Sequence, residues 1–212
     1  MLRLIPFKIH KWFPPDDPVA TAVAMLCILR EDYFLELRGI IADKFDRLDD
    51  NQRAYRRTYF WRNSVRTLEE IKSTLNWLAS REEFREMFDR EPMEVRQAFE
   101  ELKKELNKAS DTFLRVLRNR IGGHLDAPTV QAGLDDMDPA QEGMVQFADT
   151  RGRIRYRFAL DILWPSVLRE VQGSNTEQQV DKVLGDTARL TRAVEAIDAV
   201  VACYLKARRL AA

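Results

Sequence analysis

Apolar residues recur at steps of three and four over most of the chain, which is the spacing of one face of an α-helix. The first stripe follows a proline-rich segment, in which Asp16 or Asp17 can cap a helix whose first position is Pro18. This stripe predicts a long helix over about 18–40. Its expected buried face is Val19, Val23, Leu26, Leu29, Tyr33, Leu37 and Ile40.

Three more stripes predict further long helices. The second is Trp61, Val65, Leu68, Ile71, Leu75 and Leu78, and the short segment "REEFREMFDREP" after it predicts a partly helical connector. Pro92 then opens a third helix with Val95, Phe99, Leu102, Leu106, Ala109, Phe113, Leu117 and Ile121 on its apolar face. Gly122-Gly123 ends that pattern, since glycine commonly stands just past a helix terminus. The last stripe is Val180, Leu184, Leu190, Val194, Ile197, Val201 and Tyr204.

The period changes once, in the segment "MVQFADTRGRIRYRF". Val145 and Phe147, and then Ile154, Tyr156 and Phe158, take alternate positions on either side of a turn-forming stretch, which predicts a β-hairpin. A turn-rich stretch with one short helix precedes it, and a short helix through "LDILWPSVLREV" follows. We therefore expect an all-α fold: a helical bundle of four long antiparallel helices plus short helices. It forms a single domain over 1–212, with one β-hairpin inserted at about 144–158.

Charge and composition narrow the class of protein. The 34 basic residues balance the 34 acidic ones, so any site for a polyanion must be a local patch. Cys27 and Cys203 lie among apolar residues, which predicts reduced, buried thiols rather than a disulfide framework or a zinc site. No apolar run is long enough for a membrane span, and the N-terminal segment lacks the features of a signal peptide. We expect a cytoplasmic protein without membrane association.

The stretch "FLRVLRNRIGGHLD" carries the strongest candidate for chemistry. Arg118 and Asn119 stand near the end of the third predicted helix, and His124 follows after four intervening residues. This pattern resembles the hallmark of the HEPN superfamily, which consists of helical-bundle domains found in prokaryotic toxins, antiviral systems and RNA-processing enzymes. That hallmark is an arginine, a polar residue, a few further residues and a histidine near the end of a core helix. The predicted hairpin lies outside the resemblance.

The resemblance implies a metal-independent endoribonuclease that cleaves RNA by attack of the 2′-hydroxyl group. Histidine titrates near neutral pH, so His124 would act as general base or general acid. Arg118 would bind and stabilise the scissile phosphate, and Asn119 would orient a partner. In the family two protomers commonly form one composite site, which implies a homodimer. The resemblance also implies a role in defence or as a toxin, with a cognate antitoxin or regulator, and no metal or cofactor is expected.

Two other interpretations of this stretch stay open. Arg120 lies four residues before His124 and is its competing partner if the helix continues unbroken. His124 can also simply cap a helix end, where a cation favours the dipole. The alternative function is a non-catalytic helical module that binds RNA, nucleotides or a protein.

Further arginines suggest contacts to phosphate. Arg151, Arg153, Arg155 and Arg157 alternate along the second predicted strand and would share one face. We assign nucleic-acid binding to Arg120, Arg153, Arg155 and Arg157, against the alternative of a solvent face paired with acidic residues.

The segment "RAYRRTYFWRNSVR" has five arginines and no acid, with aromatic residues interleaved. It either binds nucleic acid or buries its aromatic rings beneath a rim of arginines. His10, the other histidine of the chain, has no polar constellation around it and is interpreted as a surface or packing residue.

Overall fold

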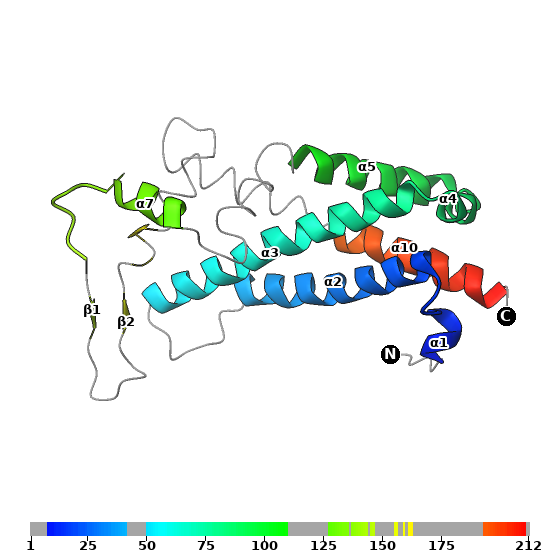
Figure 1. The fold of residues 1–212 in the computed structure, drawn as a ribbon, viewed down its shortest axis with the longest axis horizontal. Coiled ribbons are helices and arrows are strands. Elements are labelled where there is room, and N and C mark those ends of the chain that lie inside the picture. The colour runs from blue at the N-terminus through cyan, green and yellow to red at the C-terminus, as the bar shows by residue number, and fades with distance from the viewer. Residues whose placement is uncertain are drawn as a thin grey trace. The chain divides into compact units, whose positions relative to one another are not determined.

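The computed structural model describes residues 8–41, 50–109, 127–135, 137–143, 145–146, 155–156, 159, 161–162 and 193–210, and these are mostly helical. The helices are α1 (Ile9–Trp12), α2 (Pro18–Ile41), α3 (Asp50–Ala79), α4 (Glu82–Phe88), α5 (Met93–Ala109), α7 (Ala127–Asp135) and α10 (Ala193–Leu210) (Figure 1). The predicted helical class is confirmed. None of the helices in these ranges is long and apolar enough to cross a membrane.

The chain divides into two compact units. Unit 1 consists of Met1–Leu35, Thr67–Lys108 and Leu190–Ala212, and unit 2 consists of Glu36–Arg66 and Ala109–Arg189. Both α2 and α3 contribute residues to each unit. The expectation of a single domain stays a prediction.

Helix α2 begins where the sequence predicts, because Asp17 caps it. The Asp17 Oδ1 atom accepts hydrogen bonds from the backbone N–H groups of Val19 and Ala20, at 2.9 Å each. These are two of the donors that a helix start leaves without intrahelical partners. The predicted apolar face is buried from Val19 to Tyr33, whereas Leu37 and Ile40 are only half-buried.

Helix α3 carries the most regular buried face. All six of its predicted core residues are at most 4% exposed, and they are Trp61, Val65, Leu68, Ile71, Leu75 and Leu78. The helix starts at Asp50, well before the first of these residues, and Asp50 forms an ion pair with Arg53 one turn later. Several hydroxyl groups on α3 donate hydrogen bonds to backbone carbonyls in the preceding turn, for example Thr74 Oγ1 to Glu70 O at 2.8 Å. Buried hydroxyl groups are satisfied in this way by carbonyl groups of their own helix.

Helices α4 and α5 are joined by an aromatic cluster. Phe84 and Phe88 stack with their centroids 5.4 Å apart, and Phe99 of α5 packs against Phe88 at 4.8 Å. All three rings are buried. The connector predicted to be partly helical is therefore a packed helix of the unit 1 core, and α5 begins at Met93, directly after Pro92. The third helix was predicted to run on to Ile121 and to end at Gly122-Gly123, and that part lies outside the described residues.

Helix α10 is bound to the N-terminal segment through Tyr204. Its hydroxyl group donates a hydrogen bond to the carbonyl of Trp12 at 2.7 Å, and its ring stacks on Phe13 with centroids 5.4 Å apart. Arg208 Nε donates to the Tyr204 hydroxyl at 3.0 Å, and the same guanidinium group forms an ion pair with Asp17. The α2 cap and the C-terminal helix are thus held in one polar network.

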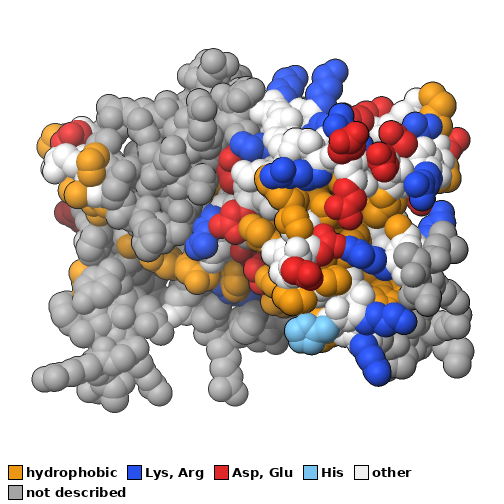
Figure 2. All heavy atoms as spheres, turned by 45° about the vertical axis from the view of Figure 1, so that its right-hand side comes forward, with side chains coloured by type: hydrophobic (Ala, Val, Ile, Leu, Met, Phe, Trp, Pro, Cys, Tyr) orange, Lys and Arg blue, Asp and Glu red, His pale blue; other side chains and the backbone are white. Residues whose placement is uncertain are grey.

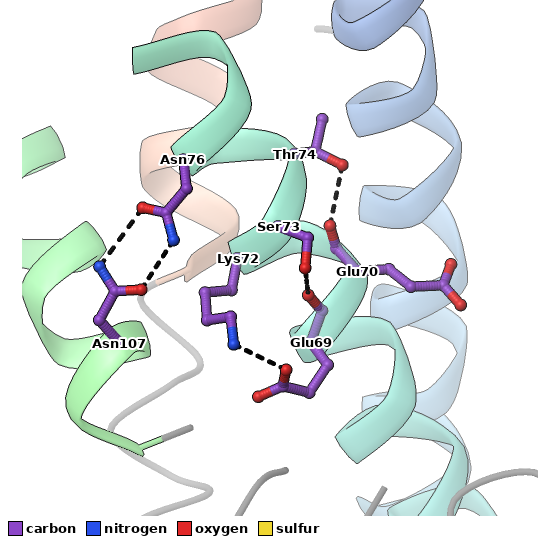
Figure 3. Close-up of polar contacts among 7 residues, drawn as sticks. All are labelled: Glu69, Glu70, Lys72, Ser73, Thr74, Asn76 and Asn107. Atoms are coloured by element: carbon purple, nitrogen blue, oxygen red, sulfur yellow. Dashed lines mark hydrogen bonds and ion pairs between the residues drawn. The ribbon is translucent and has the colours of Figure 1, made fainter. Parts of the chain in front are cut away.

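Two polar contacts join helices of unit 1, one between α3 and α5 and the other between α2 and α10. The amides of Asn76 on α3 and Asn107 on α5 bond each other reciprocally, at 2.7 and 3.3 Å (Figure 3). Arg30 on α2 donates to both carboxylate oxygens of Asp198 on α10, at 3.0 and 3.3 Å. The amide pair is partly buried, so it constrains the register of α3 against α5 more than a surface ion pair would.

Two strands of two residues each lie in the segment of the predicted hairpin, β1 (Val145–Gln146) and β2 (Arg155–Tyr156). They pair antiparallel, with Val145 opposite Tyr156 and Gln146 opposite Arg155. The predicted turn and most of the predicted strand residues lie outside the described residues. The complete hairpin over 144–158 therefore stays a prediction.

The amide pair gives a test of the fold. We expect Asn76→Leu to lower the free energy of unfolding by about 1–3 kcal/mol, because it leaves the Asn107 amide without its partner. The double variant Asn76→Leu/Asn107→Leu should lose less than the sum of the two single variants. Urea denaturation measures all of them, with Gln97→Leu on the exposed side of α5 as the control. Additive losses in the double variant would contradict the coupling.

Candidate functional site

The predicted catalytic residues lie outside the described residues. Arg118, Asn119, Arg120 and His124 fall in the segment between α5, which is described to Ala109, and α7, which begins at Ala127. Their assigned roles stay predictions. His10, on α1, has an exposed side chain, as its interpretation as a surface residue requires.

Of the arginines assigned to the predicted hairpin, only Arg155 is described, and only through its backbone. It pairs with Gln146 across the two strands. Arg153 and Arg157 lie outside the described residues. The prediction that these arginines form one phosphate-binding face therefore rests on the sequence alone.

The basic and aromatic segment is described in full, as the N-terminal half of α3 within unit 2. The sequence left open whether its aromatic residues are buried or exposed, and both occur. Trp61 is 4% exposed, and the ring of Phe60 lies so close to Gly39 of α2 that a Cβ atom at that glycine would overlap it. Tyr55 and Tyr59 are 46% and 52% exposed. The interpretation of a buried aromatic layer is correct for Trp61 and wrong for the two tyrosines.

The exposed tyrosines share a helix face with two arginines. Tyr55, Tyr59, Arg62 and Arg66 follow one another at steps of four, three and four residues, which places them on one side of α3. Burial lowers the pKa of the half-buried Arg62, while its neighbours Tyr55 and Tyr59 act in the opposite direction. An arginine stays charged at neutral pH under such a shift, so a cation lies beside two accessible rings. We call these four residues the α3 Tyr–Arg face.

The described surface that Figure 2 shows carries mixed charge. In the view of Figure 2, the Lys and Arg side chains alternate with Asp and Glu side chains, and hydrophobic side chains lie between them. Residues 53–66 contain five arginines, Arg53, Arg56, Arg57, Arg62 and Arg66, and no acidic residue, although Asp50 pairs with Arg53 from one turn before.

A second polar group lies on α3 within unit 1, and the sequence reasoning missed it. The carboxylate of Glu69 is 4% exposed and receives the ammonium group of Lys72 at 2.8 Å (Figure 3). Its Oε1 atom has no hydrogen-bond partner among the described residues. The periodic pattern contains no signal for its burial, because Glu69 lies about 100° around the helix from Leu68, outside the predicted apolar face. A single buried carboxylate neutralised by lysine is a structural ion pair rather than an acid–base pair.

The two cysteines are poor candidates for a nucleophile. Burial raises the pKa of Cys203 to about 11, with nearby Glu91 adding to the effect. Burial also raises the pKa of Cys27, and Asp198 acts in the same direction. The nucleophilic form of cysteine is the thiolate, which these surroundings disfavour. Within the described part of the chain no cluster of three or more His, Cys, Asp or Glu residues could hold a metal ion.

Comparison with known proteins identifies no family for this chain. No protein-family model, curated protein or solved structure matches the chain.

The raised pKa of Cys203 predicts its reactivity and its effect on stability. We expect alkylation of Cys203 at pH 8 to be about a hundredfold slower in the folded protein than in urea, since the thiol titrates near 11 rather than at 9.0. The Cys27→Ala variant isolates this thiol, and mass spectrometry measures the rate. Equal rates in the two states would contradict the assignment.

The sign of the pH dependence follows from the same shift. The folded state favours the neutral thiol, so its contribution to stability is present below pH 9.0 and is lost as the pH rises through about 11. The neighbouring Tyr204 titrates at a higher pH, since burial raises its pKa to about 12. Cys203→Ala should therefore flatten the earlier part of the alkaline loss, and Tyr204→Phe the later part.

Proposed function

We propose that the protein is a metal-independent endoribonuclease of the HEPN type. The observation that carries the proposal is the motif Arg118-Asn119 followed by His124 in a chain whose described part is mostly helical. Four long antiparallel helices with an inserted hairpin are the architecture we propose for the whole chain. A cytoplasmic location belongs to the same proposal.

The motif contains the groups that cleavage without a metal requires. The 2′-hydroxyl group of the substrate must lose a proton as it attacks phosphorus, and the departing 5′-oxygen must gain one. His124 is proposed for one of these transfers. Arg118 neutralises charge that develops on the phosphate, and Asn119 orients the phosphate or the imidazole. The products would carry a 2′,3′-cyclic phosphate and a free 5′-hydroxyl group.

The wider substrate contacts are proposed for the remaining arginines. Arg120, Arg153, Arg155 and Arg157 are assigned to phosphate groups along the RNA, where each positions the strand rather than reading its sequence. A role as a toxin or in defence, with a cognate antitoxin or regulator, is part of the proposal.

A homodimer is proposed because cleavage needs two proton transfers and each motif contains only one histidine. A second copy of the chain would supply the second histidine. Exposed apolar side chains on α2 are compatible with such a contact, since Met25, Ile28 and Leu35 are 42%, 64% and 60% exposed. The same surface favours the alternative function, a non-catalytic helical module that binds a protein, RNA or nucleotide. RNA cleavage distinguishes the two functions.

The catalytic prediction is tested with labelled single-stranded RNA in EDTA. We expect cleavage by the unaltered protein, complete loss in His124→Ala, and a decrease of about 10²–10³-fold in Arg118→Ala. Arg120→Ala should have a smaller effect. His10→Ala is the matched control, because it removes the other histidine from an exposed position on α1. RNA with a 2′-deoxy substitution at the cleaved position should resist cleavage. If His124→Ala cuts as fast as His10→Ala, the catalytic proposal fails.

The oligomeric prediction is separate. Light scattering at micromolar concentration should give about twice the mass of one chain, since a composite site requires two protomers. A mass equal to one chain, in a preparation that cleaves RNA, would exclude the dimer while leaving the chemistry intact.

A further inference from the structure

The two exposed tyrosines of α3 are the unusual feature of the basic segment. In the same helix Trp61 is 4% exposed and Phe60 is half-buried, whereas Tyr55 and Tyr59 are 46% and 52% exposed. They lie one turn apart, so two flat aromatic surfaces face solvent on the same side of the helix. Packing of the core does not account for them.

The ring of Tyr59 is supported by a neighbouring ring of α3. Tyr59 meets Phe60 edge to face, with ring centroids 5.4 Å apart and an angle of 78° between the rings. Phe60 in turn lies against the backbone of Gly39 on α2. A ring supported in this way loses little conformational freedom when a flat ligand group stacks on it.

Cationic groups lie beside the rings. Arg62 follows Tyr59 by three residues and is close enough to both tyrosines for them to affect its pKa, and Arg66 is exposed one turn further on. The α3 Tyr–Arg face thus offers stacking surfaces and positive charge side by side, which is the combination that binds bases and phosphates of single strands.

The spacing favours unpaired bases. Four helical residues rise about 6 Å, whereas stacked bases along one strand are about 3.4 Å apart, so bases held by the two tyrosines are drawn out of a continuous stack. In a duplex the base faces are covered by their neighbours, and A-form RNA exposes chiefly its backbone and shallow groove. A duplex could use only the arginines of this face.

We propose that the α3 Tyr–Arg face binds single-stranded RNA, with unpaired bases stacked on Tyr55 and Tyr59 and adjacent phosphate groups held by Arg62 and Arg66. The choice of RNA rests on the proposed ribonuclease function. The contacts themselves involve bases and phosphates, not the 2′-hydroxyl group. Single-stranded DNA of the same sequence is therefore expected to bind with similar affinity.

Binding is measured by fluorescence anisotropy in EDTA with a labelled single-stranded RNA, using the full chain and its His124→Ala variant. We expect Tyr59→Leu to weaken binding about tenfold, and Tyr59→Phe to bind like the unaltered protein because its ring still stacks. Arg66→Gln should lower the slope of log affinity against log salt by about 0.7, the value for one phosphate contact on a single strand. Lys104→Gln, an exposed position on α5, is the control for charge.

Three results would overturn the proposal. The first is equal binding by Tyr59→Leu and Tyr59→Phe when both are folded by circular dichroism; Tyr55→Leu and Tyr55→Phe repeat the comparison if Tyr59→Leu does not fold. The second is an affinity for duplex RNA equal to that for the single strand. The third is an affinity for an abasic strand of the same length equal to that for the normal strand. Either result would show that only charge is recognised.

The test is separable from cleavage. If binding depends on the tyrosines but the unaltered protein does not cleave RNA, the proposed binding face is supported and the ribonuclease proposal is refuted. If His124→Ala abolishes cleavage but substitution of either tyrosine leaves binding unchanged, the ribonuclease proposal is supported and the proposed binding face is refuted.

Discussion

The burial of one face of α3 is the constraint on which the described structure of unit 1 depends. Leu68, Ile71, Leu75 and Leu78 are fully buried. Each fully buried side chain of this size contributes about 1.5–3 kcal/mol relative to exposure. Contacts on either side of this face join α3 to the neighbouring helices. The Thr74 hydroxyl group contacts the sulfur of Met25 on α2, and the Asn76 amide donates a hydrogen bond to Asn107 on α5. Thr74, Ser64 and Asn76 of α3 are tolerated beside this face because each finds a hydrogen-bond partner on its own helix or on a neighbouring one.

Helix positions could be predicted from the sequence wherever apolar periodicity is strong. The core residues of α3 and the cap at Asp17 are examples, since both follow from local geometry. The early start of α3 at Asp50 could not be predicted in this way, because the first turns carry charged side chains rather than a buried stripe. In α10 the predicted Ile197 and Tyr204 are buried, whereas the predicted Val201 is half-buried and Val200, which was not predicted, is buried. Steps of three and four from Ile197 and Tyr204 reach both Val200 and Val201, so spacing alone does not choose between them.

For the candidate sites, the sequence predicts which residue types are present but not how they are arranged. The arginine–asparagine–histidine motif follows from the sequence, but its geometry lies outside the described residues. The exposure of Tyr55 and Tyr59 was not predictable, because tyrosine suits both core and surface and the pattern does not distinguish them. The burial of Glu69 was not predictable either, because its position lies outside the periodic apolar face of α3. Lys72, one turn away, neutralises the buried carboxylate.

The polar network around Tyr204 has a consequence for synthesis of the chain. Unit 1 is assembled from three separate stretches, and the last of them includes α10, whose Arg208 and Tyr204 reach back to Asp17 and Trp12. While the ribosome is still making the middle of the chain, the buried faces of α2 and α4 lack the helix that covers them. Closure across such long separations is slow compared with local helix formation. The nascent protein therefore exposes apolar surface until α10 emerges, and that interval is when it most needs a chaperone.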